Sequence, residues 1–574
     1  MCGILLHKKN GLKYNEFENS LNMLDHRGPD GKNIIQEKNL FIGHTRLSII
    51  DLSKKGLQPM ISNCNNYIMS FNGEIYNYKN LRNELLEKGY KFRSETDSEV
   101  ILNGYIEYKE KIFKKLDGIF AIVIYDKKND IIITARDSFG VKPLYYFISQ
   151  TELIISSEVR VFVSNKTINK IAEILFLSHG YIPHPFTMYE EVFSHESGSY
   201  SIIKNSKITF HKFFDLKTIM SCKRKRYFNK ELLLEAVKKQ LVSDAKTGCF
   251  LSGGVDSSIL TLILNQQKKN IETYSINFSE TESEKKFQEY LIRNNDLNNI
   301  SKEINYEDFE ENFNDFLKSM DQPTIDGFNT YIVSKLANEN KSKVTYSGVG
   351  SDEIFYGYPT FKSLFILKFL NLIVDFIPIS FLPNKFKKID YLKLGTSYGF
   401  YLSKRGIFSI HEISKILKIS QNEIKSVLNN LNNYNSDLSN FSLLDKMAYY
   451  EIKYYMEGQL LRDADIFGMA NSIEIRVPFL DINVVKDALS LNSYSKIRSS
   501  VNKIKLIENF KNELPENIYS RKKRGFELPF KNWIKIKGIN KKIAQEYGYN
   551  STKENIHWSK IWALYILRFK LDKN

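Results

Sequence analysis

The pattern of hydrophobic and polar positions divides the chain into two parts of different character. Up to about residue 195, apolar residues alternate with polar ones or form short blocks, and Gly, Asn and Asp separate the blocks. This pattern predicts a sheet-rich first part. The clearest strand stretches are LFIGHTRLSII (40–50), YIMSFNGEIY (67–76), IFAIVIYD (119–126) and IIITARD (131–137).

Two stretches of the first part show the helical period instead. Apolar residues recur every three or four positions in YKNLRNELLEKG (78–89) and in the segment that follows Asp97. We therefore predict a helix at each of these places.

The second part begins after a mixed, polar stretch. Residues 196–230 end in SCKRKRYFNK, and we predict that they connect two domains, residues 1–195 and 231–574. Beyond them, the short apolar stretches FLSG (250–253), YSINF (274–278) and KVTYSG (343–348) alternate with long helical patterns. This alternation is typical of a parallel α/β sheet. From about residue 355 the pattern is mainly helical.

One helical stretch, FKSLFILKFLNLIVDFIPISFL (361–382), is long and apolar enough to raise the question of a membrane span. Lys368 and Asp375 place charges inside it, and Pro378 interrupts the helix. Charges at the middle of a bilayer are costly. We therefore predict two helices broken at the proline, and leave open whether they pack on the core or weakly contact a membrane surface.

Length and composition indicate a globular protein of two or three domains. A chain of 574 residues, 42% hydrophobic and 26% charged, is too long for one core and too apolar to be disordered. The four cysteines, at positions 2, 64, 222 and 249, form no CxxC pair, so we expect neither zinc nor disulfides, and a reducing, cytoplasmic setting. No basic and apolar stretch precedes Cys2, so we do not expect it to carry a lipid.

The net charge of +16 raises the question of an anionic partner. Apart from KRKR (223–226) and RKKR (521–524), the basic residues are scattered, as on an ordinary solvated surface. We therefore expect no nucleic-acid partner.

The strongest candidate for a ligand site is LSGGVDSSIL (251–260). It follows a predicted strand, contains two consecutive glycines, and then begins a helix whose backbone amides and dipole favour an anion. It lacks the GxxxxGK[ST] spacing of a Walker A loop, but SGGxDS is the signature of enzymes that cleave ATP between its α- and β-phosphates. We predict that the ATP-binding residues here are Ser252, Gly253, Gly254, Asp256 and Ser257, with Asp256 also a ligand of Mg²⁺.

A second group of carboxylates follows another predicted strand, in SGVGSDEIFYGY (347–358). Parallel sheets bind ligands at the carboxyl ends of their strands, so this loop should lie near the first one. Asp352 is then a candidate for the second magnesium ligand. Taken alone, this motif also fits a simple loop.

As a set, the motifs of this chain resemble those of the glutamine-hydrolysing asparagine synthetases. In the order of that family they are MCGI (1–4), HRGPDG (26–31), GHTRLSIIDL (43–52), FNGEIYN (71–77), TDSE (96–99), SGGVDSS (252–258), GSDE (350–353) and RVPFLD (476–481). The resemblance implies an α+β domain followed by an α/β domain. The first is an N-terminal-nucleophile (Ntn) hydrolase αββα sandwich with class II glutamine amidotransferase activity. The second is a parallel-sheet ATP-pyrophosphatase domain with a helical C-terminal part; a homodimer is left open.

In the first domain, the resemblance assigns roles to residues around Cys2. Removal of Met1 would leave Cys2 with a free α-amine, whose pKa of about 7.7–8.0 suits a general base for its own thiol. The resemblance further implies that Arg46 binds the glutamine carboxylate and that Asn72 and Gly73 form the oxyanion hole. Glu74 and Asp97 are implied to bind the glutamine amino group.

In the second domain, the resemblance adds residues to the predicted ATP site. Lys503 is implied to meet the phosphates, but Lys505 lies only two residues away, so the choice between them stays open. Arg476 is expected to support the site rather than touch a substrate. The positions that would line the ATP site are Leu251, Ile276, Ser347 and Gly348, with Asp256 and Asp352 as magnesium ligands.

Val349 departs from the family pattern. The family typically has a glutamate here, in SGEGSDE, whereas a valine can neither accept a proton nor pair with an ammonium group. This departure leaves the acceptor open between aspartate and another carboxylate, such as a sugar-linked uronic acid in surface polysaccharide synthesis.

The resemblance implies two half-reactions. Cys2 releases ammonia from glutamine, and ammonia then displaces AMP from a carboxylate that ATP has adenylated with loss of pyrophosphate. Since ammonia must stay unprotonated, we expect an apolar tunnel between the two sites. Two other classes remain as alternatives: a catalytically inactive binding protein, which the intact Cys2, Asn72, Asp256 and Asp352 argue against, and a tRNA-modifying ATP pyrophosphatase, which the complete glutaminase half argues against.

Overall fold

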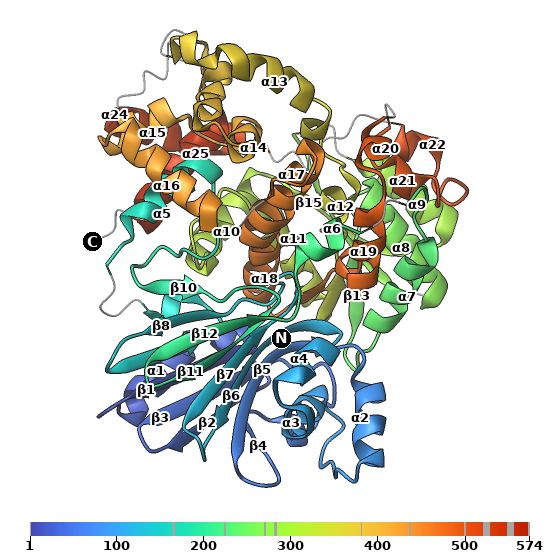
Figure 1. Cartoon of the computed structure of the whole chain (residues 1–574). Helices are drawn as coiled ribbons and strands as arrows, with labels where there is room; N and C mark the ends of the chain where they lie inside the picture. The colour runs from blue at the N-terminus through green and yellow to red at the C-terminus, as the bar shows by residue number, and fades with distance from the viewer. Residues whose placement is uncertain are drawn as a thin grey trace.

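The structure is a computed structural model, and it describes residues 2–162, 167–222, 225–268, 271–280, 284–379, 382–434, 438–498, 501–520, 529–547 and 556–571. Figure 1 shows two joined parts, a lower part made mostly of strands and an upper part made mostly of helices, with the N-terminus at their junction. The two characters seen in the sequence therefore correspond to two regions in space.

The lower part contains two antiparallel sheets. Their strand orders are β10-β8-β9-β1-β3-β2 and β12-β11-β7-β6-β5-β4. The strands are β1 (Gly3–Lys9), β2 (Gly31–Glu37), β3 (Leu40–Arg46), β4 (Met60–Ile61), β5 (Tyr67–Ile75), β6 (Gly118–Asp126), β7 (Ile131–Arg136), β8 (Tyr145–Ile148), β9 (Glu152–Ser156), β10 (Val192–Ser194), β11 (Ser199–Lys204) and β12 (Lys207–Lys212). The predicted strands at 40–50, 67–76, 119–126 and 131–137 are all confirmed.

The two sheets pack face to face, and helices cover their outer faces. Apolar side chains from both sheets, among them Ile4, Ile42, Ile68 and Val123, form one buried cluster between them. The covering helices are α1 (Tyr14–Asn22) against the first sheet, and α2 (Tyr78–Glu87), α3 (Asp97–Tyr108) and α4 (Ile112–Lys115) against the second. This layering is the expected αββα sandwich, and both predicted helices are present.

The predicted connection at 196–230 differs from the structure. Its first half forms the hairpin β11–β12, and β11 pairs with β7 at the edge of the second sheet. The pattern looked polar because two inward positions of β11 are serines: Ser199 and Ser201 are buried, and the Ser201 hydroxyl lies 2.6 Å from that of Thr134. Buried serines count as polar in a hydrophobicity pattern, so this pattern did not predict the strand.

The upper part is built on a parallel sheet of five strands, in the order β15-β14-β13-β16-β17. The strands are β13 (Thr247–Phe250), β14 (Glu272–Phe278), β15 (Asn298–Ile304), β16 (Val344–Tyr346) and β17 (Glu474–Arg476). The predicted strand at 250–253 therefore ends at Phe250, and LSGG is the loop after it. Parallel strands at 274–278 and 343–348 are confirmed.

Helices surround this sheet and make up the C-terminal part, as predicted. They are α5 (Lys170–His179), α6 (Leu216–Met220), α7 (Lys230–Gln240), α8 (Val255–Gln267), α9 (Lys285–Asn295), α10 (Tyr306–Ser319), α11 (Phe328–Glu339), α12 (Ser351–Phe355), α13 (Leu364–Ile373), α14 (Ser397–Arg405), α15 (Ile410–Leu417), α16 (Gln421–Tyr434), α17 (Leu443–Tyr450), the π-helix η9 (Glu451–Leu461), α18 (Arg462–Met469), α19 (Ile482–Ser490), α20 (Ser493–Ile497), α21 (Ile504–Ile507), α22 (Glu516–Tyr519), α23 (Phe530–Ile536), α24 (Ile539–Tyr547) and α25 (Trp558–Lys570).

Helix α13 covers the first part of the apolar stretch 361–382, and residues 380 and 381, where the predicted second helix would begin, lie outside the described residues. Helix α13 is followed by a short 3₁₀ turn at Val374–Phe376, and no second α-helix begins between Pro378 and the end of the described range at residue 379. Phe369, Leu372 and Phe376 are largely exposed, and weak contact with a membrane surface stays a prediction. In the described part of the chain, no helix has the length and hydropathy needed to cross a bilayer.

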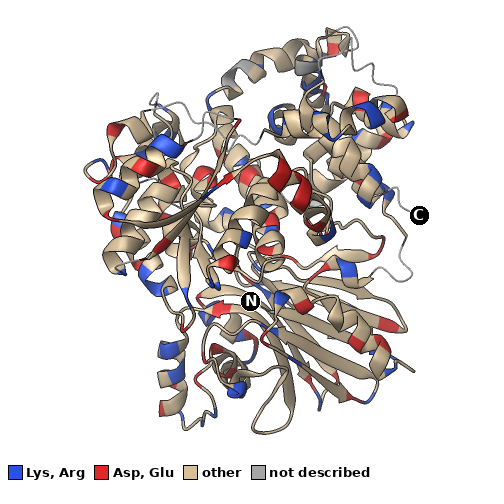
Figure 2. Ribbon diagram, turned by 180° about the vertical axis from the view of Figure 1, so that it is seen from behind, with Lys and Arg blue, Asp and Glu red and all other residues tan. Residues whose placement is uncertain are grey.

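Charged residues of both signs are interspersed over the molecule. Figure 2 shows lysines and arginines among aspartates and glutamates on the helices and strands of both parts. This distribution agrees with the scattered basic residues of the sequence.

Candidate active sites

The first site surrounds Cys2, immediately before strand β1. The Cys2 side chain is buried, and its backbone N–H donates to Oδ1 of Asn72 on β5 at 2.9 Å. The Nδ2 group of Asn72 is also buried and has no hydrogen-bond partner among the described residues. A buried donor without a partner is costly, so an oxyanion next to Cys2 would satisfy it.

Gly73 occupies a place that only glycine tolerates. Its φ is +148°, and a Cβ atom built there would lie 2.0 Å from the carbonyl oxygen of Ile119 on the paired strand β6. The backbone next to Asn72 therefore approaches β6 more closely than any side chain would allow.

Arg46 lies at the end of β3 and is held by a loop. Its guanidinium donates to the carbonyl oxygens of Ser53 at 2.6 Å and Asp51 at 2.5 Å. Burial raises the pKa of the Cys2 thiol, while the backbone of Leu47 and the charge of Arg46 favour the thiolate. Arg46 is thus fixed near the nucleophile, where the resemblance placed it.

Glu74 and Asp97 are two buried acids beside this site. Asp97 begins α3 and accepts from the backbone N–H of Ile75 at 3.0 Å. Burial raises the pKa of Asp97 to about 6. Burial, together with Asp97 and Glu474, raises the pKa of Glu74 well above its usual range. The structure therefore brings these predicted residues together around Cys2.

Arg27 holds the backbone of the nucleophile, a role that the sequence analysis did not assign. It is fully buried, and its Nε donates to the Cys2 carbonyl oxygen at 3.0 Å. Its two other nitrogens donate to Glu158 at 2.8 Å and to Asp465 of α18 at 2.7 Å. The only sequence signal was its place in HRGPDG. Arg27 thus ties Cys2 to the second domain.

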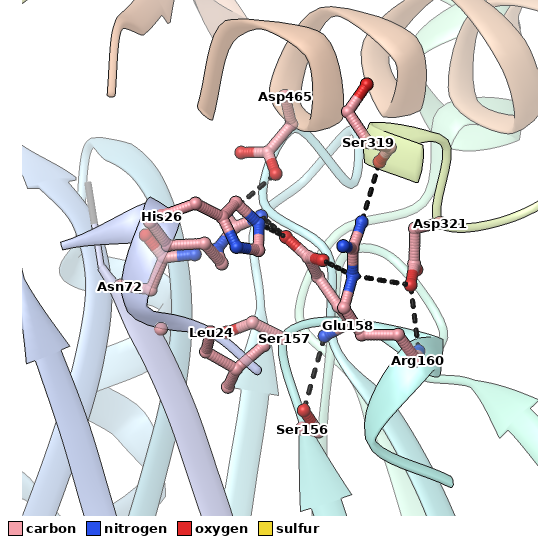
Figure 3. Close-up of polar contacts among 12 residues, drawn as sticks. Leu24, His26, Asn72, Ser156, Ser157, Glu158, Arg160, Ser319, Asp321 and Asp465 are labelled. Atoms are coloured by element: carbon pink, nitrogen blue, oxygen red, sulfur yellow. Dashed lines mark hydrogen bonds and ion pairs between the residues drawn. The ribbon is translucent and has the colours of Figure 1, made fainter. Parts of the chain in front are cut away.

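Figure 3 shows how polar groups from the second domain meet the first around Glu158 and Arg160. Arg160 Nε lies 2.5 Å from Glu158, and its Nη2 donates to the Ser319 carbonyl oxygen at 2.6 Å. The Asp321 carboxylate accepts from the backbone N–H groups of Val159 and Arg160, each at 2.8 Å. Such a buried polar network favours one arrangement of the two domains.

The second site is a cavity of about 350 Å³ at the carboxyl ends of strands β13, β14 and β16. Gly253 does not line it, but takes a φ of +79° in the turn that leads into α8. Val349 and Glu353 also line it. The predicted residues in its wall are Leu251, Ser252, Gly254, Asp256, Ser257, Ile276, Ser347, Gly348 and Asp352.

Lys503, not Lys505, reaches this cavity's carboxylates. Its buried ammonium contacts Asp256 and lies 2.7 Å from Asp352. Burial disfavours the charge, but the two carboxylates outweigh it and raise the pKa of Lys503. Lys505 instead pairs with Glu508 at 2.9 Å. The geometry therefore favours Lys503, and its contact with the ATP phosphates stays a prediction.

The two aspartates also fit a magnesium ion bound together with a nucleotide. Both carboxylates meet at one cation, the Lys503 ammonium, and carboxylate oxygens are hard ligands that Mg²⁺ prefers. Over the described ranges, no group of three or more His, Cys, Asp and Glu side chains could hold a metal ion alone. Phosphate oxygens and water would have to complete the coordination.

Glu353, the last residue of the GSDE motif, is a further acid in this cavity, and no role was predicted for it from the sequence. It is fully buried and accepts from the Tyr358 hydroxyl at 2.5 Å. Burial and the neighbouring Asp352 raise the pKa of Glu353 to about 7. A proton-accepting group is therefore present in the cavity, although position 349 is a valine.

The two sites share a wall formed by β17 and α18. Side chains alternate along a strand: Ile475 lines the nucleotide cavity, whereas Arg476 bonds Glu474 at 2.7 Å and lies 3.7 Å from Glu74 of the first site. On α18, Asp463 and Ala464 line the cavity, and Asp465 bonds Arg27. One strand and one helix thus touch both sites.

The wall is charged on the side of Cys2. Arg27, Lys142, Asp465, Glu474 and Arg476 are all buried there, and Lys142 Nζ lies 3.9 Å from Asp465. Burial lowers the pKa of Lys142, against the pull of Glu474 and Asp465. This part of the interface therefore carries arginines and acids that pair across it, and the apolar tunnel stays a prediction.

Comparisons with known proteins identify relatives over both parts. The family model described as a glutamine amidotransferase domain matches residues 1–214, and the one described as asparagine synthase matches residues 229–560. "Asparagine synthetase [glutamine-hydrolyzing] 1" of Bacillus subtilis is 32% identical over 535 residues, 89% of this chain and 84% of the relative.

Two further relatives and one solved structure are also similar to this chain. "Putative asparagine synthetase [glutamine-hydrolyzing] 2" of Methanocaldococcus jannaschii is 32% identical over 67% of this chain and 81% of its own length. "Amidase chyE" of Penicillium rubens is 26% identical over 94% and 88%. Among solved structures, a glutamine phosphoribosylpyrophosphate amidotransferase from B. subtilis aligns with a TM-score of only 0.29 at 17% identity, over 47% of this chain and 65% of that one.

Proposed function

Because the chain belongs to the family of glutamine-hydrolysing asparagine synthetases, we propose that it takes ammonia from glutamine and transfers it to a carboxylate activated by ATP. The observation that carries this proposal is the shared wall of β17 and α18, which places the Cys2 site and the nucleotide cavity back to back. The residues proposed to act at each site are those predicted from the sequence. The free cysteines are consistent with the cytoplasmic setting we propose.

In the first half-reaction, the Cys2 sulfur attacks the side-chain carbonyl carbon of glutamine. The thiol proton passes to the α-amine that removal of Met1 would free, and Oδ1 of Asn72 already holds that nitrogen at 2.9 Å. Asn72 Nδ2 and the Gly73 backbone stabilise the oxyanion. The C–N bond breaks, the amine returns the proton, ammonia leaves, and water later releases glutamate from sulfur.

In the second half-reaction, an acceptor carboxylate oxygen attacks the α-phosphorus of ATP. A new P–O bond forms, the bond to the β-phosphate bridge breaks, and pyrophosphate leaves on the SGGVDSS loop, with Lys503 near the departing charge. Asp256 and Asp352 would hold the magnesium ion, which supplies further positive charge to the phosphates when bound. Ammonia then attacks the acyl carbon, AMP leaves, and the surplus proton passes to a base, for which Glu353 is placed in the cavity.

The acceptor has two candidates. Aspartate is the one that the relatives' names imply. A second candidate, a carboxylate on a sugar such as a uronic acid, is favoured by Val349, which puts an apolar side chain into the cavity wall where the family typically has glutamate.

A carboxylate screen tests the proposed function. The full chain is supplied with MgATP and glutamine, and AMP, pyrophosphate and glutamate are measured with each of a panel of carboxylic acids, aspartate included. We expect one acid to stimulate equal amounts of AMP and pyrophosphate. Release of ADP and phosphate instead, with every acid, would contradict adenylation.

A further inference from the structure

A second, larger cavity adjoins the nucleotide cavity and is not used by either half-reaction as described. Its volume is about 670 Å³, and it lies among α5, α10, α11, α14, η9, α23 and α25. In Figure 1, α5, α14 and α25 gather at the upper left, on the side of the molecule away from α2 and α7. Asp326 and Asn329 line both cavities, so the two spaces meet at these residues.

The walls of this second cavity are mainly aromatic. Rings of Tyr181, Tyr401, Tyr455, Phe530, Trp558 and Trp562 face it. Phe530 packs against both tryptophans, with ring centroids 5.7 and 5.2 Å apart, so these rings form one rigid surface. Flat aromatic faces bury the C–H surfaces of a ring-shaped ligand without requiring a charge on it.

A few polar groups stand among these rings. Gln459 is buried, and its Nε2 donates a hydrogen bond to the Thr324 hydroxyl at 3.3 Å. His179 at the end of α5 also lines the cavity, and burial lowers its pKa to about 4, so it is uncharged near neutral pH. Both ring nitrogens of His179 already bond within the protein, so Gln459 and Asn329 supply the uncharged polar groups that suit ligand hydroxyls.

The buried positive charge of the cavity is already neutralised. Arg405 lies 2.8 Å from Glu451, and its guanidinium is stacked between Tyr358 and Tyr455, with ring centroids 4.1 and 4.0 Å away. Tyr358 lines the nucleotide cavity and Tyr455 lines the second one, so this stack forms part of the border between them. Asp326 and the exposed Lys531 are the other charged residues in the described lining, so the two carboxylates of a free aspartate would have only Lys531 left to pair with.

The volume of the second cavity also argues against a free amino acid as its ligand. Ligand sites of roughly 300–1,000 Å³ hold drug-sized molecules, and a space of about 670 Å³ far exceeds what the nine non-hydrogen atoms of aspartate require. The acceptor that matches both cavities carries its carboxylate at one end of a polyhydroxylated ring.

We propose that the second cavity binds the sugar ring of a hexuronic acid, whose carboxylate passes Asp326 and Asn329 to reach the α-phosphate in the nucleotide cavity. This inference rests on the proposed function, because it uses the same adenylation step. The carboxylate oxygen forms the bond to the α-phosphorus as pyrophosphate leaves, and ammonia then forms the C–N bond as AMP leaves. The product is a hexuronamide.

The test measures AMP release by the full chain with MgATP and ammonium chloride, so that the glutaminase site is not required. The acceptors are aspartate, free glucuronic and galacturonic acids, their methyl glycosides, and their uridine-diphosphate-linked forms. We expect kcat/KM for at least one hexuronic acid form to exceed that for aspartate at least tenfold. Comparing the free acids, the methyl glycosides and the nucleotide-linked forms shows which form of the sugar the enzyme uses.

Variants then assign the effect to the cavity. Trp558→Ala removes the half-buried ring, and Ile407→Trp fills space from the half-buried wall. Each should lower kcat/KM for the hexuronic acid at least tenfold and leave the KM for ATP and glutamine hydrolysis unchanged, which also shows that the variant is folded. Tyr494→Ala, at an exposed aromatic residue outside both cavities, is the matched control and should change nothing.

The outcomes separate the two proposals. Preferred use of aspartate, unaffected by either cavity variant, would overturn the hexuronic acid inference and leave amide synthesis standing. If no carboxylate stimulates AMP release, the proposed function itself fails, and this inference with it.

Discussion

At the scale of single residues, the nucleotide cavity depends on one buried lysine between two carboxylates. Lys503 is placed there by a left-handed backbone turn, with φ of +55°, immediately before α21. The family resemblance favoured Lys503 but left Lys505 open, because the two lysines lie only two residues apart. Their difference arises from burial, since one side chain points into the cavity wall and the other pairs with Glu508 on its own helical turn.

We predict that Lys503→Ala lowers kcat for AMP formation by about 10²–10³, the usual cost of removing one preorganised group that stabilises developing charge. Lys505→Ala is the matched control and should stay within about twofold of the wild type. AMP is measured with ammonium chloride as the nitrogen donor. The reverse ranking of the two variants would show that the phosphate-facing lysine is Lys505.

The glutamine site should respond to pH through Asp97. Burial raises the pKa of Asp97 to about 6, so this carboxylate is charged at pH 7 and mostly neutral at pH 5. A neutral group no longer attracts the glutamine ammonium, so we expect the KM for glutamine to rise roughly tenfold between pH 7 and pH 5. The KM is determined at each pH from the rate of glutamate release.

Asp97→Asn supplies the comparison for this prediction. The variant should have a high glutamine KM at pH 7 already, and its KM should not change further down to pH 5. A wild-type KM that stays constant over this range would exclude Asp97 as the titrating group.

At the scale of elements, β17 and α18 join the two sites. Arg27 and Asp465 connect α18 to the backbone of Cys2, and Arg476 connects β17 to Glu74. Both contacts are buried, and a buried charge that loses its partner destabilises a protein strongly. These pairs therefore hold the wall in place between the Cys2 site, where we propose that ammonia is made, and the nucleotide cavity, where we propose that it is used.

Asp465→Ala should lower the free energy of unfolding by about 3 kcal/mol, because it leaves Arg27 with one of its two carboxylate partners. It should also raise the ratio of glutamate to AMP above one, since ammonia escapes when the wall shifts. Chemical denaturation and product quantification measure the two effects. A ratio that stays at one would limit Asp465 to a structural role.

Asp315→Ala is the control for this variant. Asp315 forms an exposed ion pair with Lys318 at 3.7 Å, on the surface of α10. Exposed pairs contribute about 0–1 kcal/mol, so both the stability and the product ratio should remain close to those of the wild type.

At the scale of the whole molecule, the two domains divide the reaction between them. The backbone N–H of residue 2, not its side chain, bonds Asn72, and the Cys2 carbonyl oxygen bonds Arg27. A substitution of the thiol therefore leaves the connection between the domains intact. The nucleophile can be removed without disturbing the second site.

Cys2→Ala should abolish glutamine-dependent AMP formation and keep ammonia-dependent AMP formation within about twofold of the wild type. Cys64→Ala, at an exposed cysteine, serves as the control and should keep both activities. The measurement is AMP release with glutamine or with ammonium chloride. Full glutamine-dependent activity of Cys2→Ala would remove Cys2 from the mechanism.

Much of the fold and of each separate site was predictable from the sequence. Short apolar blocks predicted the strands β3, β5, β6 and β7, which are buried on both faces because each sheet packs against the other sheet on one side and against helices on the other. The Gly-Gly turn of SGGVDSS and the glycine at position 73 mark places where the backbone must come close to another group. These features are local, so neighbouring residues along the chain are enough to indicate them.

The tertiary structure alone decided how the parts combine. The hairpin β11–β12 was hidden because two of the three buried positions of β11 are serines, and the pairs Arg27–Asp465 and Arg476–Glu74 join residues about 400 positions apart. The adjoining aromatic cavity likewise collects side chains from seven helices. Packing places such residues together only when the whole chain has folded, so no local pattern records it. The sequence by itself determined which chemistry the chain carries, and the packing decided that both sites share one wall and what space lies beside them.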